Sequence, residues 1–197
     1  YMAGAELPGV IVNIMRSGPG LGNVYPEQSD YNQTVKGGGH GSYRCVVLAP
    51  GSVQEMCDFT IKAFEMSFAY RTPAILLADG LLGQMMETLE LPARELPRPD
   101  TASWALEGTA QTRRNLITSI FLNATEQESH NLKLQAKYER MDLEAFHEAY
   151  LCDDAEIVLI GYGISSRIPR TAAEALRATG ARAGVFRPLA LSPFPPA

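Results

Sequence analysis

RSGPGLGNVYPEQSDYNQTVKGGGHG, residues 16–41, is the stretch around which the fold of this chain is organised. It follows directly on an apolar run, GVIVNIM at residues 9–15, which is short and rich in β-branched side chains. Such a run, placed between Pro8 and a Gly/Pro cluster, predicts a buried strand. A strand that leads into a glycine-rich turn bearing Arg16 is where an open α/β sheet usually places a ligand.

The composition of the 197 residues is ordinary for a soluble globular protein, with 46% hydrophobic and 20% charged residues and a net charge of −5. No cluster of Lys and Arg indicates nucleic acid as a partner, and no apolar run reaches the roughly 18 residues of a membrane helix. Cys45, Cys57 and Cys152 form no C-x-x-C pair, so their spacing predicts neither a zinc site nor an iron–sulfur cluster. We expect reduced thiols in a cytoplasmic protein without a signal peptide.

The first half of the chain has the pattern of a parallel strand–helix–strand unit. Ser52 and Glu55 have the spacing of a capping box at the start of a helix. A crossover of this length predicts a right-handed βαβ unit. In order, we expect a short helix over 26–33, a loop over 36–41, a strand over 44–49, a helix from Ser52 to Tyr70 and a strand over 74–78.

The second half repeats the α/β pattern after an interruption. Residues 81–91 are expected to be helical for a turn or two, and 92–125 to form a linker with little core of its own. Thr125 and Glu128 predict another capped helix that extends to Tyr150. A second βαβ unit then follows, with a strand over 157–160, a turn over 161–166, a helix over 167–179 and a strand over 183–187. Because the pattern starts and stops abruptly, we expect a fragment of a larger subunit.

Arg16 is the first candidate for binding a ligand. Its guanidinium can hold a carboxylate through two parallel hydrogen bonds. Gly18, Gly20 and Gly22 leave room for a ligand to approach the backbone, and Pro19 lies among them. A tight turn with a structural arginine paired to a neighbouring acid explains the same residues equally well.

His40 is a second candidate, because a histidine among glycines can reach a ligand or transfer a proton. A solvent-exposed loop histidine is the alternative. Asp79 with Gly80 ends a predicted strand where ligands gather, although a plain turn explains the pair as well. The glycine-rich turn is neither a P-loop nor a G-x-G-x-x-G fingerprint, and the sequence assembles no Ser/His/Asp set, catalytic residue or metal site.

Several motifs together resemble the alpha subunit of 2-oxoacid:ferredoxin oxidoreductases of the 2-oxoisovalerate, or branched-chain, type. They are IVNIMRSGPGLG, PEQSDYNQ, GGGHG, VVLAPGSVQEM and PAILLADGLLGQ, followed by IVLIGYGISSR and AAEALRATGARAGVFRPLALSPFP. The resemblance implies the C-terminal part of a pyrimidine-type thiamine-diphosphate-binding domain at 1–91. It also implies a linker with a helix at 92–153, and the start of a transketolase C-terminal-like α/β domain at 154–197.

The resemblance implies oxidative decarboxylation of a 2-oxoacid, expected to be 2-oxoisovalerate, to an acyl-coenzyme A with electrons passing to ferredoxin. Arg16 would bind the substrate carboxylate, and Gly18, Pro19, Gly20, Gly22 and His40 would line the pocket. A beta subunit would hold the diphosphate and Mg²⁺, and gamma and ferredoxin-like subunits would carry the iron–sulfur clusters. By this reading the chain is inactive alone.

This sequence departs from the family pattern at the turn, where Gly18-Pro19-Gly20 replaces the more frequent G-P-S and a hydroxyl is lost. The upstream glutamate that activates the aminopyrimidine, and the G-D-G motif for magnesium and diphosphate, do not occur in the sequence. Two other functions therefore remain open. One is a noncatalytic scaffold subunit, and the other is a thiamine-dependent decarboxylating or transketolase-like enzyme that does not use ferredoxin.

Overall fold

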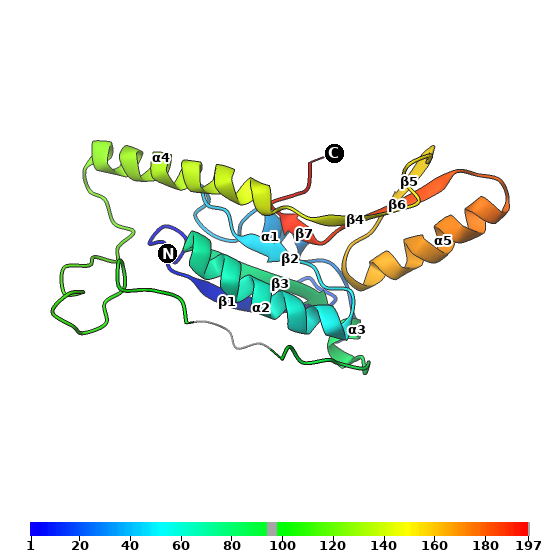
Figure 1. Ribbon diagram of the computed structural model, residues 1–197, viewed down its shortest axis with the longest axis horizontal. Helices are drawn as coiled ribbons and strands as arrows, with labels where there is room; N and C mark the ends of the chain where they lie inside the picture. Colours follow the sequence, from blue (N-terminus) through cyan, green and yellow to red (C-terminus); the bar gives the residue numbers. More distant parts are fainter. Residues whose placement is uncertain (94–97, 197) are drawn as a thin grey trace.

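The computed structural model describes residues 1–93 and 98–196, and Figure 1 shows its elements. The helices are α1 (Tyr31–Val35), α2 (Val53–Tyr70), α3 (Gly80–Gln84), α4 (Ala124–Met141) and α5 (Arg167–Ala178), with short 3₁₀ turns η1 (Asp142–Glu144) and η2 (Gly163–Ser166). The strands are β1 (Gly9–Met15), β2 (Val46–Leu48), β3 (Pro73–Asp79), β4 (His147–Tyr150), β5 (Ile157–Ile160), β6 (Ala183–Pro188) and β7 (Ala190–Ser192).

The first sheet has the strand order β1-β3-β2-β7, in which β1, β3 and β2 are parallel and β7 is antiparallel to β2. Helix α2 lies across one face of this sheet (Figure 1). Its buried side chains pack in one cluster with Val46 and Leu48 of β2 and Ala74 and Leu76 of β3. The β2–α2–β3 crossover confirms the predicted parallel βαβ unit and the mixed α/β class.

Strand β1 occurs where the sequence predicts it, but the prediction that it is buried is wrong. It pairs with β3 alone and forms an edge of the sheet. Ile11, Val12 and Ile14 are 46%, 54% and 41% exposed. An apolar run predicts a strand, whereas its burial depends on neighbours that the run itself does not encode.

Two predicted helices have different bounds in the structure. The helix expected over 26–33 begins only at Tyr31, and residues 26–29 are extended or irregular. The helix expected to reach Tyr150 ends at Met141, because His147–Tyr150 pairs with β6 as strand β4. Its cap is Asn123, whose side chain accepts from the N–H groups of Thr125 and Glu126, and not Thr125 as predicted.

The second sheet has the order β4-β6-β5, with β5 and β6 parallel and β4 antiparallel to β6. Helix α5 packs on it through Ala173, which confirms the second βαβ unit. Only Leu189 separates β6 from β7, so the chain passes directly from the second sheet into the first. The division into domains at 1–91, 92–153 and 154–197 stays a prediction, and the third range supplies β7 to the first sheet.

A nearly buried ion pair joins the second sheet to helix α2, which packs on the first sheet. Arg187 of β6 makes a two-pronged contact with the Glu55 carboxylate at the start of α2, and it also contacts Glu148 of β4. The N-cap of α2 is Ser52, as predicted, since its hydroxyl accepts from the Glu55 N–H. The Glu55 carboxylate, however, accepts from the Gly51 N–H and not from the Ser52 N–H. Glu55 therefore accepts a hydrogen bond at the start of α2 and also links α2 to the second sheet.

The linker expected over 92–125 has no helix or strand among its described residues up to 123, and its last two residues already belong to α4; residues 94–97 lie outside the described part. Trp104 nevertheless joins part of it to the turn between α2 and β3, because the guanidinium of Arg71, the C-cap of α2, lies 4.6 Å from the centre of its ring. Over 1–93 and 98–196, none of the helices combines the length and hydropathy needed to cross a bilayer.

Candidate functional site

The turn that carries Arg16 is a closed hairpin at the carboxyl end of β1. Arg16 pairs with Pro26 in an isolated antiparallel bridge. The Ser17 N–H donates to the Tyr25 carbonyl at 2.9 Å, and the Ser29 hydroxyl donates to the Arg16 carbonyl at 3.1 Å. The main chain at Arg16 is thus held from both sides, at the edge of a parallel sheet where ligands bind. Residues 16–26 are called the Arg16 hairpin below.

The glycines of the Arg16 hairpin serve its own geometry. Gly20 and Gly22 have φ angles of 65° and 54°, in the left-handed region. A Cβ at Gly22 would lie 1.8 Å from the Ser17 carbonyl oxygen, whereas a Cβ at Gly20 would meet nothing within 4 Å. The Gly18 N–H donates to the Glu27 carboxylate at 3.3 Å, and the Gly18–Pro19 peptide is cis. The tight-turn interpretation explains Gly22 without a ligand.

The Arg16 side chain is exposed, and over the described residues its guanidinium makes no ion pair or hydrogen bond. The interpretation as a structural arginine paired to an acid therefore finds no partner in the described part of the chain. A fixed main chain with an uncommitted donor fork suits the capture of an external carboxylate. Because the residue is exposed in the single chain, such a carboxylate would need further protein to enclose it.

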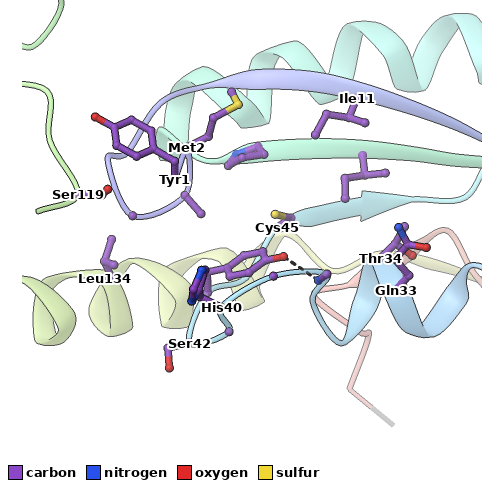
Figure 2. A pocket seen from close by; sticks show the side chains of 18 of the residues that line it. Tyr1, Met2, Ile11, Gln33, Thr34, His40, Ser42, Cys45, Ser119 and Leu134 are labelled. Carbon is purple, nitrogen blue, oxygen red and sulfur yellow. Dashed lines mark hydrogen bonds between the residues drawn. The ribbon is translucent and has the colours of Figure 1, made fainter.

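An open groove of about 1260 Å³ runs along β1 and is shown in Figure 2. One wall is the N-terminal segment with Tyr1 and Met2, and the floor includes Ile11 (Figure 2). The opposite wall is the glycine-rich loop with His40 and Ser42. His40 thus lines the groove, while Arg16 and the Gly18–Gly22 turn do not. The structure therefore separates the sequence-predicted residues into two places.

Several polar residues of the groove were not singled out from the sequence. Asn13 of β1 donates to the Asp30 carboxylate at 3.2 Å, and the Tyr43 hydroxyl accepts from the Gly38 N–H at 2.8 Å. A ring nitrogen of His130 lies 2.8 Å from the Gly4 carbonyl, and its ring stacks on Phe121. These residues come from separate segments, and no local motif joins them.

The described residues do not fit the diphosphate and magnesium end of a cofactor. No Lys or Arg lines the groove, and no group of three or more His, Cys, Asp or Glu in the described part of the chain could hold a metal ion. Cys45 lines the groove, and burial raises the pKa of its thiol to about 11. The thiol is therefore protonated at neutral pH and is a poor nucleophile.

Comparison with solved structures identifies the same fold in an enzyme from Magnetococcus marinus. That structure is described as a 2-oxoglutarate:ferredoxin oxidoreductase with 2-oxoglutarate, coenzyme A and succinyl-CoA bound. The TM-score is 0.79 over 98% of this chain and 39% of that one, at 22% identity. At this identity the likeness concerns the fold.

Several curated relatives match almost the whole chain. The ketoisovalerate oxidoreductase subunit VorB of Methanothermobacter thermautotrophicus is 57% identical over 99% of the chain and 56% of the relative. The 2-oxoglutarate synthase subunit KorA of Archaeoglobus fulgidus is 34% identical over 99% and 57%. The chain thus spans a little over half the length of these relatives.

Two family models divide the chain between them. The pyruvate:ferredoxin oxidoreductase core domain II matches residues 155–197. The thiamine-diphosphate-binding model of pyruvate flavodoxin/ferredoxin oxidoreductases matches residues 1–149, well over half of the sequence. The chain therefore belongs to the pyruvate flavodoxin/ferredoxin oxidoreductase family and includes its thiamine-diphosphate-binding domain.

Proposed function

We propose that the chain is part of the alpha subunit of a thiamine-diphosphate-dependent 2-oxoacid:ferredoxin oxidoreductase. The enzyme would oxidatively decarboxylate 2-oxoisovalerate to an acyl-coenzyme A and pass the electrons to ferredoxin. The family membership supports the reaction class. We choose 2-oxoisovalerate because the relative named for ketoisovalerate is 57% identical to this chain, whereas the relative named for 2-oxoglutarate is 34% identical.

Arg16 would bind and orient the substrate carboxylate. The observation that carries this role is an exposed guanidinium without a partner in the described residues, on a main chain fixed by the Ser29 hydroxyl and the Pro26 bridge. A planar donor fork holds a carboxylate through two hydrogen bonds and so fixes its direction as well as its position. The keto carbon next to that carboxylate would then be presented in one orientation to the cofactor.

A second polypeptide would complete the site. Leu21, Val24 and Tyr25 belong to the Arg16 hairpin, and all three are exposed. We propose that a beta subunit covers them and holds the diphosphate and Mg²⁺, while gamma and ferredoxin-like subunits carry the iron–sulfur clusters. The described residues of this chain contain no metal cluster of their own, and we place the assembled enzyme in the cytoplasm.

Replacement of Arg16 in the complete enzyme complex tests the role. Arg16→Ala should lower kcat/KM for the 2-oxoacid. The decrease should correspond to a lost interaction free energy of roughly 1.5–3 kcal/mol, the contribution of a charge-assisted hydrogen-bonded pair. A clamp that binds substrate and transition state equally raises KM, whereas a contact made only in the transition state lowers kcat. Arg16→Lys keeps the charge and loses the fork, so it should restore only part of the loss. Unchanged KM and kcat in Arg16→Ala would refute the role.

The scaffold alternative is separated by a binding experiment. A complex reconstituted without this subunit should bind thiamine diphosphate more weakly than the complete complex, as judged by calorimetric titration. Equal affinity with and without the subunit would favour a scaffold. The iron content of the purified complex separates the third possibility, since a ferredoxin-independent enzyme needs no clusters.

A further inference from the structure

The 161–166 turn of the second βαβ unit packs against the segment that follows the Arg16 hairpin. The centre of the contact is Gln28, whose side-chain amide is engaged at both ends. Its Nε2 donates to the Tyr162 carbonyl at 3.1 Å, and its Oε1 accepts from the Ser165 hydroxyl at 2.9 Å. The Tyr162 hydroxyl also donates to the Gln28 carbonyl at 3.4 Å. A glutamine held this way has one position and one orientation.

The surroundings of Gln28 leave little room for adjustment. Gly163 has a φ angle of 58°, and a Cβ there would lie 3.2 Å from Gln28 Nε2. The Tyr162 ring packs 5.7 Å from the Tyr31 ring. Burial raises the pKa of Tyr162 to about 12, and the nearby Tyr31, Asp79 and Asp30 contribute to the increase. The Tyr162 hydroxyl therefore remains a donor at neutral pH.

The segment around Gln28 is also the one that holds Arg16. Pro26 forms the bridge with Arg16, and the Ser29 hydroxyl donates to its carbonyl. Gln28 lies between these two residues in the sequence. Gln28 therefore belongs to the same short segment as the two contacts that fix the Arg16 main chain.

We propose that Gln28, clamped by Tyr162 and Ser165 of the second βαβ unit, is a positioning residue that fixes the main chain from which the Arg16 guanidinium reaches the substrate. The inference rests on the proposed function of Arg16 and adds to it. It gives the 161–166 turn a part in substrate binding that acts through Gln28. Gln28 acts through Arg16, so its effect on substrate affinity must disappear once the guanidinium is removed.

The first test uses Gln28→Ala in the complete enzyme complex. KM for the 2-oxoacid should rise roughly three- to tenfold, the size expected for the loss of one or two neutral hydrogen bonds. For a clamp that binds substrate and transition state equally, the value of kcat and the KM for coenzyme A should stay within about twofold. Ser165→Ala leaves the donation to Tyr162 intact and should give a smaller rise in the same parameter.

Arg167→Gln is the matched control. Arg167 also joins the second unit to the first, through the Gly51 carbonyl at 3.0 Å and the Glu87 carboxylate at 2.8 Å. It makes no contact with residues 16–30 in these interactions. Its loss should lower stability without raising KM for the 2-oxoacid. An equal rise in KM in Arg167→Gln would mean that any weakening of this interface has the same effect, and would overturn the proposal.

The double variant Arg16→Ala/Gln28→Ala decides whether Gln28 acts through Arg16. The proposal requires the double variant to have the KM of Arg16→Ala alone, because no guanidinium remains to be positioned. If the KM increases of the two single variants multiply in the double variant, Gln28 acts independently of Arg16, and the inference is overturned. If Arg16→Ala alone changes neither KM nor kcat, the proposed function fails. If Arg16→Ala raises KM and Gln28→Ala does not, the positioning inference alone fails.

Discussion

Gly22 carries the tightest steric constraint in the Arg16 hairpin. Its φ angle of 54° is strained for any other residue, and a Cβ would lie 1.8 Å from the Ser17 carbonyl oxygen. Gly20 shares the positive φ angle but has open space where a Cβ would stand. The two glycines therefore separate the effect of crowding from the effect of backbone conformation.

We expect Gly22→Ala to open the hairpin and Gly20→Ala to leave its hydrogen bonds in place. In Gly22→Ala the Ser17–Tyr25 and Asn23–Ser17 bonds should weaken, which hydrogen exchange at the Ser17 and Asn23 amides would detect. Gly20→Ala should cost only about 1 kcal/mol from its left-handed conformation. Equal exchange at these amides in both variants would contradict a role for the Gly22–Ser17 contact.

Helix α4 shows what decides where an element begins. Asn123 accepts from two N–H groups at the start of α4, while Thr125 already lies inside the helix. Asn123→Ala should therefore destabilise the first turn by about 1 kcal/mol. Thr125→Ala, the matched change, removes no capping acceptor and should leave the first turn intact. Amide exchange of residues 124–127 measures the difference, and equal protection in both variants would refute the assignment of the cap.

The sequence predicted those elements whose signals are local. Ser52 begins α2 because its hydroxyl and the Glu55 N–H are three residues apart, and both strands flanking this helix have unbroken apolar runs. It failed where partners distant in sequence decide. His147–Tyr150 became a strand by pairing with β6, and β1 became an edge strand by having β3 as its single neighbour. Neither fact is contained in the local pattern.

The candidate site divides in the same way. Arg16 and His40 could be named from the sequence, because a charged or titratable side chain among glycines after a strand is a recognisable pattern. The groove wall could not, since Asp30, Tyr43 and Asn131 come from separate segments that only the fold brings together. The contact of Gln28 with Ser165 joins positions 137 apart, so no spacing in the sequence could have suggested it.

In the molecule as a whole, β7 makes the stability of one sheet depend on the other. Leu191 of β7 is 1% exposed and packs with Met15, Val47 and Leu77 of the first sheet. Leu191→Ala should cost about 2–5 kcal/mol, as expected for a truncated core leucine. The exposed Leu143 supplies the control, since Leu143→Ala should change stability by less than about 0.5 kcal/mol. Urea unfolding of the subunit measures both, and equal midpoints would refute the role of β7 in the core.

The single residue between β6 and β7 limits how far the second sheet can rotate relative to the first. Leu189 is fixed at both ends, since its carbonyl accepts from the Ala49 N–H and its own N–H donates to the Phe146 carbonyl. A one-residue connection that is hydrogen-bonded in this way leaves few backbone angles free to accommodate a rotation. If the second sheet rotates, for instance when a subunit docks on it, we expect the movement to strain the end of β2, whose neighbour Ala49 is hydrogen-bonded to Leu189.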